Sequence, residues 1–442
     1  MSKSAGIKMS SWDMILDFFD GKPLLDENDI SKGFYYTTIE TLDKILCSGA
    51  LYSTNYRYLN DPGEWQYGYN RMIRECQSIA DQYENDSEKK EFVMYLRDYI
   101  FKAQHYLNDY PVYNSSVFRG NYSEIFTISF TEEEDLISQW ERYAKESGVV
   151  LELDFSTLHD EQICLYQETV NKTRIPVGIL PQRVAYKDEE IKKLSNKSME
   201  TMWGKFAEKA FSDDRLRPYF HMFVRYIASY IKNAAYEQEK EIRISCYPLI
   251  NEATKAEEID SSEIVYTIQE GVMIPHVPIY CGMKREDGIS VCGLPIRSIR
   301  VGPGYNQDSV FRGLIHRMEC GEIKICLLSK ENQMNVKNKY ILEGIASHIQ
   351  IEIQKGQSNK YLLENIVNKL ESGEYLGELK KSLDAVYKKS KKESLDDVSE
   401  ELQELKQRFY EQIFEDYEKE QFCTSEGILI KKSKIPYLFS KR

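Results

Sequence analysis

The 442-residue sequence is poor in histidine and has no paired cysteines. Its six histidines lie far apart and its nine cysteines include no Cys-x-x-Cys pair, so neither a zinc site nor a histidine-based triad is indicated. Scattered cysteines favour buried thiols in a reducing cytosol. No stretch reaches the ~18 apolar residues of a membrane span, and residues 1–20 lack the features of a signal peptide. We therefore predict a cytoplasmic protein with no membrane segment and no bound metal.

Several common catalytic and nucleotide-binding motifs are also absent. The sequence contains no GxxxxGK[ST], GxSxG, HExxH or GxGxxG. Its net charge of −13 argues against non-specific binding of a polyanion, so a protein target is favoured over nucleic acid. Hydrophobic residues make up 42% of the chain, which is enough for a sizeable core.

Extended and helical patterns alternate from residue 34 to about residue 330. An aromatic, β-branched strand at 34–38 precedes a short helix that ends at Gly49, a second strand and a polar loop at 60–64. Helical periods follow at 70–110, 136–146, 188–237 and 308–318. Further strands are predicted at 125–130, 149–155, 242–246, 264–267, 277–281, 296–301 and 323–328. We predict an α+β domain over residues 1–330.

Residues 331–422 differ in composition, being charge-rich, proline-free and helical in period. Within this block, apolar residues alternate by three and four positions over 395–413, which is an a/d seam. The seam is shorter than the ~3–4 heptads of a stable coiled coil, so a hairpin packed on its own domain is favoured over homo- or hetero-oligomerisation through it. We interpret the block as a helical insertion, with residues 423–442 completing the α+β domain.

One charged group falls on a predicted strand. Glu239, Glu241 and Arg243 alternate in sequence, so their side chains project to one face. Considered alone, this pattern favours a solvated face of an edge strand, with Arg243 paired to a glutamate.

Two further side chains could reach a ligand. Ser129 lies within the apolar strand 125–130, where a hydroxyl is either simply tolerated or bonded to a ligand. Tyr143 shares a helix face with Trp140. Packing in the core is favoured for Trp140, whereas the Tyr143 hydroxyl could reach a pocket.

Taken in order, a set of short motifs resembles a broad bacterial family known as a domain of unknown function. The motifs are Tyr35-Tyr36, Asn60-Asp61-Pro62-Gly63-Glu64, Ser129-Phe130, Trp140 to Tyr143, Glu239 to Arg243, Ile296 to Pro303 and Ser433 to Tyr437. The resemblance covers residues 34–330 and about 425–440. The block between Ser329 and Phe422 departs from it and looks like an insertion.

A looser resemblance suggests a chemistry. Residues 34–54 are similar to the Tyr-His-x-Thr, helix, Gly-x-Leu opening of ADP-ribosyltransferases, and residues 239–244 are similar to their Glu-x-Glu strand. Tyr36 stands where those enzymes keep a His or an Arg. This resemblance implies an ADP-ribosyltransferase-like split β-sheet core with large helical insertions, and NAD as a substrate.

The same resemblance implies roles for individual residues. Cleavage of the nicotinamide–ribose bond develops positive charge on the sugar, which a carboxylate can stabilise. Glu241 would supply that carboxylate, and Glu239 would orient or deprotonate the acceptor. Tyr36 and Thr38 would contact the nicotinamide side.

Other residues would support or surround this chemistry. Ser129 would support Glu241, and Arg243 would act as a pyrophosphate clamp or, as we favour, as the partner of a carboxylate. The rim of the site would be formed by loop residues Asn60, Asp61 and Glu64.

These features predict transfer of ADP-ribose from NAD to a macromolecule, or hydrolysis of NAD. Members of such families that are enlarged by insertions resemble toxins or effectors of bacterial conflict and anti-phage defence. Two alternatives stay open. One is a catalytically silent ligand-binding module whose Glu-x-Glu-x-Arg strand is a structural ion-pair ladder, and the other is an interaction scaffold acting through residues 395–413.

Overall fold

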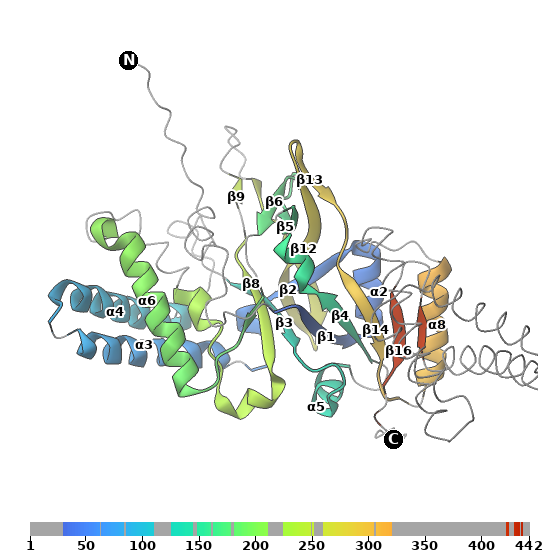
Figure 1. Cartoon of the computed structure of the whole chain (residues 1–442), viewed down its shortest axis with the longest axis horizontal. Helices are drawn as coiled ribbons and strands as arrows, with labels where there is room; N and C mark the ends of the chain where they lie inside the picture. Colours follow the sequence, from blue (N-terminus) through green and yellow to red (C-terminus); the bar gives the residue numbers. More distant parts are fainter. Residues whose placement is uncertain are drawn as a thin grey trace, which may run out of the picture.

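The computed structural model describes most of residues 30–320 and a few residues near the C-terminus (Figure 1). Within 30–320 the description leaves out residues 62, 84, 110–124, 145–147, 161, 178–180, 211–223, 249, 252–259 and 305. Beyond it, residues 421–423, 428–433 and 435 are described. The predicted strand at 323–328 and the seam at 395–413 therefore lie outside the described residues.

The fold is α+β, with a large open mixed sheet and helices packed against it. The strands are β1 Lys32–Thr38, β2 Ala50–Asn55, β3 Phe126–Thr131, β4 Gly148–Asp154, β5 Ile163–Glu168, β6 Arg174–Val177, β7 Gln182–Arg183, β8 Glu241–Cys246, β9 Ile250–Asn251, β10 Asp260–Ser261, β11 Val265–Gln269, β12 Val272–Arg285, β13 Gly288–Val291, β14 Ile296–Val301, β15 Gln421–Cys423 and β16 Leu429–Lys432. The helices are α2 Ile39–Ser48, α3 Glu64–Gln82, α4 Ser87–Asp109, α5 Ile137–Gln139, α6 Asp188–Ala210 and α8 Gln307–Cys320. Short 3₁₀ turns η1 Tyr56–Tyr58, η4 Phe155–His159 and η6 Ala234–Glu239 and a π-helix, η2 Trp140–Ala144, complete the set.

The main sheet divides at β3. Its strand order is β15-β16-β14-β4-β1-β3-β2-β12-β5-β6, with β8 on β3 and β7 on β8. β8 pairs with β3 along its whole length, whereas β1 meets β3 only at Thr131 and β2 meets it only at Phe126 and Thr127. Thr127 and Thr131 both pair with β8 along one edge of β3. β1 and β2 therefore pair with the opposite edge of β3, each at one end, and they diverge between these two ends.

The first three elements form for local reasons. Thr38 caps α2, its hydroxyl accepting a bond from the Thr41 N–H at 3.3 Å, and Gly49 ends the helix at φ +72°. Leu42, Ile45 and Leu46 are buried, as their spacing predicts. The predicted strand–helix–strand opening is confirmed.

Helices gather at both ends of the sheet (Figure 1). Helices α3, α4 and α6 contact one another on one side, and α8 packs on β14 and β16 on the other. β16 runs parallel to β14, so a segment from near the C-terminus extends the sheet. Among the helices described, none combines the length and hydrophobicity that crossing a membrane requires.

Three predicted elements differ from the structure. The segment 188–237, predicted to be helical, begins as α6, but its last residues lie in the 3₁₀ turn η6. The helix predicted at 136–146 is a short α-turn, α5, followed by the π-helix η2. Its wider turns let Trp140 point into the protein while Arg142 is exposed at its surface. The strand predicted at 277–281 extends over the whole of β12, because only its middle is buried and the exposed ends carry no hydrophobic alternation.

Candidate functional site

A polar face of the sheet lies where β8 pairs with β3. Ser129 lies opposite Arg243, and Thr131 lies opposite Glu241, so these four side chains share one face. The alternate residues of β8 are buried in the apolar core on the other face. Glu241 and Arg243 are only 5% and 1% exposed. The expectation of a solvated edge strand is therefore wrong, because β8 is flanked by β3 and β7 and its polar face is covered.

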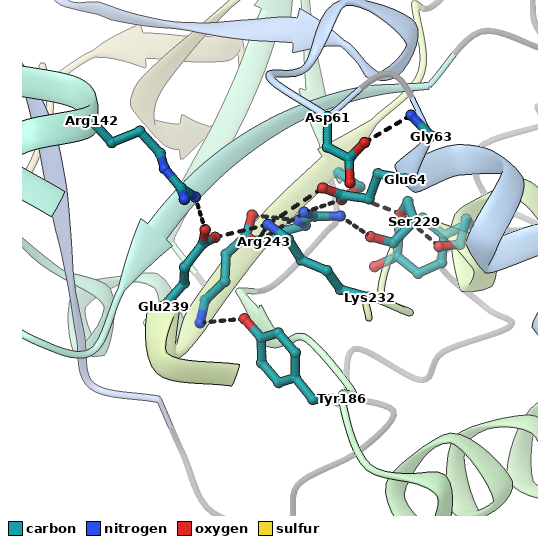
Figure 2. Close-up of polar contacts among 12 residues, drawn as sticks. Asp61, Gly63, Glu64, Arg142, Tyr186, Ser229, Lys232, Glu239 and Arg243 are labelled. Carbon is teal, nitrogen blue, oxygen red and sulfur yellow. Dashed lines mark hydrogen bonds and ion pairs between the residues drawn. The ribbon is translucent and has the colours of Figure 1, made fainter. Parts of the chain in front are cut away.

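All three guanidinium nitrogens of Arg243 donate hydrogen bonds (Figure 2). Its Nε lies 2.5 Å from Glu241 Oε1, and its Nη2 donates to Glu241 Oε2 at 2.9 Å and to Glu64. Its Nη1 donates to the carbonyl of Ser229. The interpretation of Arg243 as the partner of a carboxylate is confirmed, and a second carboxylate, Glu64, joins it.

Lys232 provides the second buried cation. Its Nζ lies 2.8 Å from Glu239, 2.9 Å from Glu241 and 3.3 Å from Glu64. Burial alone would lower the pKa of Lys232, but the surrounding carboxylates outweigh it and raise the pKa, Glu241 most strongly. The ammonium also lies 5.0 Å from the ring centre of Tyr236. Sequence reasoning missed Lys232, which lies outside every predicted strand and motif.

Glu241 is held in its ionised form. Burial would raise the pKa of this carboxyl, but Arg243 and Lys232 overcome that effect and lower the pKa to about 2. Both of its oxygens accept bonds from these cations, and its backbone N–H donates to the Tyr186 hydroxyl at 3.1 Å. Glu241 is thus a fixed negative charge at neutral pH rather than a proton acceptor.

A rim of less buried residues surrounds this cluster. Arg142, with 42% of its side chain exposed, pairs with Glu239 and lies 5.9 Å from the ring centre of Tyr236. The charge of Arg142 balances that of Glu239. The three carboxylates of the cluster and the three cations, Arg142 included, therefore have no net charge. The Tyr236 hydroxyl bonds to Asp61.

Loop residues complete the rim. Tyr143 bonds to Asn60, and the Asp61 carboxylate accepts the Gly63 N–H at 2.9 Å. Glu64 was expected at this rim, but it is only 4% exposed and lies inside the cluster. The reason is that it begins helix α3, which directs its carboxylate to Arg243.

Ser129 is a partly exposed residue on the polar face. In the described part of the chain, no strand occupies the β3 edge between Thr127 and Thr131 on the side shared by β1 and β2. The hydroxyl of Thr127, on the same face, is buried without a hydrogen-bond partner among the described residues. Among the described residues of β3 and β8 on this face, Ser129 is therefore the one that is partly exposed.

Tyr36 and Thr38 are not brought into the cluster. The Tyr36 hydroxyl donates to the Glu133 carbonyl at 3.1 Å and accepts the Leu136 N–H at 2.9 Å, so it holds the loop after β3. Its ring packs edge-on against Trp140, which is buried as predicted. Thr38 serves as the helix cap described above.

The arrangement presents charge without a metal centre. Over the described ranges, no three His, Cys, Asp or Glu side chains are placed so that they could hold a metal ion. Fold and site together describe an α+β protein with a charge-balanced carboxylate–cation cluster beside a divided sheet. Such a cluster can stabilise a developing positive charge or act as a structural network.

Comparison with known sequences places part of the chain in a family. Residues 139–244 match the family described as "Protein of unknown function (DUF2971)". The match runs from η2 through β8 and includes Arg142, Lys232 and Glu241. The predicted resemblance to a domain of unknown function is confirmed over these residues. No curated protein and no solved structure matches the chain.

Proposed function

We propose that this protein cleaves the nicotinamide–ribose bond of NAD and transfers the ADP-ribosyl group to a macromolecule or to water. The observation that carries the proposal is the Glu241 carboxylate, which is ionised at neutral pH and lies on the same face of β8 and β3 as the partly exposed Ser129. The division of the sheet at β3 also agrees with the split core of the ADP-ribosyltransferases that the sequence resembles.

The first step of NAD cleavage requires a negative charge near the sugar more than it requires a base. The bond between the ribose carbon and the nicotinamide nitrogen breaks, and its electron pair leaves with nicotinamide. Positive charge then develops on the sugar, where Glu241 would stabilise it. The acceptor oxygen or nitrogen attacks the same carbon and gives up its proton to solvent water. Glu239, held by Lys232 and Arg142 at the edge of the cluster, would orient this acceptor.

The setting of the activity is also part of the proposal. The net charge of −13 disfavours nucleic acid, so a protein acceptor fits the chain better. Modification of an essential target, or depletion of NAD, would suit a toxin or effector in bacterial anti-phage defence. Ser129, partly exposed on β3, would support the substrate next to Glu241.

One observation favours a second candidate, a catalytically silent ligand-binding or interaction module. Both oxygens of Glu241 are occupied by Arg243 and Lys232, and the side chain is buried. In that case the cluster would only join β8 to the start of α3, and ligands would meet the rim around Asn60 and Asp61.

Labelled NAD separates the two candidates. Four proteins are incubated with NAD labelled in the adenylate part: the native chain, Glu241→Gln, Ser129→Val and a control, Glu168→Gln. The control removes a carboxylate that pairs with Arg174 away from the cluster. We expect the native chain and the control to release nicotinamide or label an acceptor, and Glu241→Gln and Ser129→Val to lose most of this activity. Circular dichroism establishes which variants fold, and Ser129→Val, at a partly exposed site, carries the test if Glu241→Gln unfolds. Equal activity in all four proteins, or none in the native chain, would remove the proposal.

A further inference from the structure

Two cysteine thiols face each other across neighbouring strands, away from the charged cluster. β12 and β13 are antiparallel, with Gly282 opposite Val291. One position further along, Cys281 lies opposite Cys292, and the Cys292 N–H donates to the Cys281 carbonyl at 3.2 Å. The two sulfur atoms are 3.8 Å apart.

This placement fits the geometry of a disulfide. Directly opposed residues of antiparallel strands have Cα atoms about 4.5–5.5 Å apart, which falls within the ~4.4–6.8 Å found for disulfides. Bond formation would bring the sulfurs from 3.8 Å to about 2.0 Å, a movement that side-chain rotation can supply. The backbone can stay in its present register.

The two thiols differ in exposure. Cys281 is buried in the core, where β12 also pairs with β5, whereas Cys292 is partly exposed just beyond β13. A small oxidant can therefore reach Cys292 first, and the buried Cys281 is placed to react second. The exposed thiols Cys47 and Cys320 lie on α2 and α8, outside this hairpin.

We propose that Cys281 and Cys292 form a reversible dithiol site that hydrogen peroxide oxidises to a disulfide. The Cys292 thiolate attacks one peroxide oxygen, the O–O bond breaks, and water leaves with the thiol proton, giving a sulfenic acid. The Cys281 sulfur then attacks the Cys292 sulfur, the S–O bond breaks, and a second water leaves with the Cys281 proton. The sulfurs are oxidised, the peroxide is reduced, and the bridge ties the return from β13 to β12. This site is independent of the proposed NAD chemistry.

The test is made on the native full-length chain. The protein is treated with hydrogen peroxide, its remaining thiols are alkylated, and it is digested without reduction for mass spectrometry. We expect a linked pair of peptides carrying Cys281 and Cys292, lighter by two hydrogen atoms than the unlinked pair, and its disappearance after dithiothreitol. Irreversible oxidation of Cys292 without a bridge, a bridge from either residue to another cysteine, or no reaction at either residue would overturn the proposal.

Two variants test whether Cys292 is the thiol that reacts first. Cys292→Ser should abolish the linked peptide and leave Cys281 unmodified, since Cys281 is buried. Cys320→Ser, at an exposed cysteine outside the hairpin, should leave the yield unchanged. Modification of Cys281 by peroxide in the folded Cys292→Ser protein would contradict the proposed order. The measurement on the native chain needs no variant and decides whether the site exists.

Discussion

Replacement of Arg243 by methionine should be among the most destabilising changes available in this protein. Methionine keeps much of the side-chain volume but removes the guanidinium, which is 1% exposed and bonded to Glu241, Glu64 and the Ser229 carbonyl. Glu64 and Glu241 would then depend on Lys232, which also contacts Glu239, as their remaining buried cation.

The size of the effect follows from these contacts. Breaking a buried ion pair by removing one partner costs about 3–5 kcal/mol, because the other charge remains buried. A total stability of about 5–15 kcal/mol is usual for a domain, so Arg243→Met should remove a large part of it. Lys187 pairs with Glu237 at the surface, with 59% of its side chain exposed, so Lys187→Met should change the free energy of unfolding far less.

Equilibrium unfolding in urea, followed by tryptophan fluorescence, measures both free energies. The double variant Arg243→Met with Glu64→Gln should be more stable than the sum of its single changes predicts, since it removes one of the two stranded charges. Similar losses in Arg243→Met and Lys187→Met would refute the view that these buried charges depend on one another.

Three further results are expected. Gly68→Ala should destabilise the protein by about 1–3 kcal/mol, because a Cβ there would lie 2.4 Å from the Ala228 carbonyl oxygen. Gly204→Ala, in a helix with nothing within 4 Å, should instead stabilise it by about 0.5–1 kcal/mol, and calorimetric shifts of the same sign would contradict this contrast. Burial lowers the pKa of His276 from 6.5 to about 4, so the unfolded chain takes up a proton first and stability should fall as pH drops through this range. Urea titrations should show this loss in the native chain and not in His276→Gln. The pKa of Glu241 falls from 4.5 to about 2, so its contribution is present above pH 4.5 and is lost on acidification towards pH 2. An acid-unfolding curve of Glu241→Gln with the same steepness as the native one would count against this assignment.

Local patterns predicted the parts of the fold that depend on neighbouring residues. The strand, helix and strand from β1 to β2 follow from aromatic and β-branched residues, a helical apolar stripe and a glycine stop within about twenty residues. The shared face of Glu241 and Arg243 follows equally from strand geometry. In each case the determining contacts lie close together in sequence.

The burial of the site could not be predicted in this way. Arg243 meets Glu64 across 179 positions of sequence, and neither residue carries a local sign of that contact. Glu64 follows a turn-rich loop, which favours a place at the rim. Lys232 lies within 188–237, a segment predicted to be helical, where nothing in the sequence marks it as a site residue. Tyr36 shows the converse, since its motif suggested a ligand contact while its hydroxyl holds the loop between Glu133 and Leu136. Long-range packing decides such cases.

The charge state of the cluster bears on which reactions suit it. Glu241 is tied to Arg243 and Lys232 and stays ionised, and the pKa of Tyr143 is raised by burial and then by Glu239 and Glu241, so neither group exchanges protons readily near neutral pH. Ordinary glycosides and esters require a proton donor for the leaving group. The nicotinamide of NAD is a cationic leaving group that departs as a neutral molecule, so its release requires stabilisation of the sugar cation and no acid. A carboxylate that stays ionised near neutral pH suits that requirement, and on this ground we propose NAD rather than a neutral glycoside as the substrate.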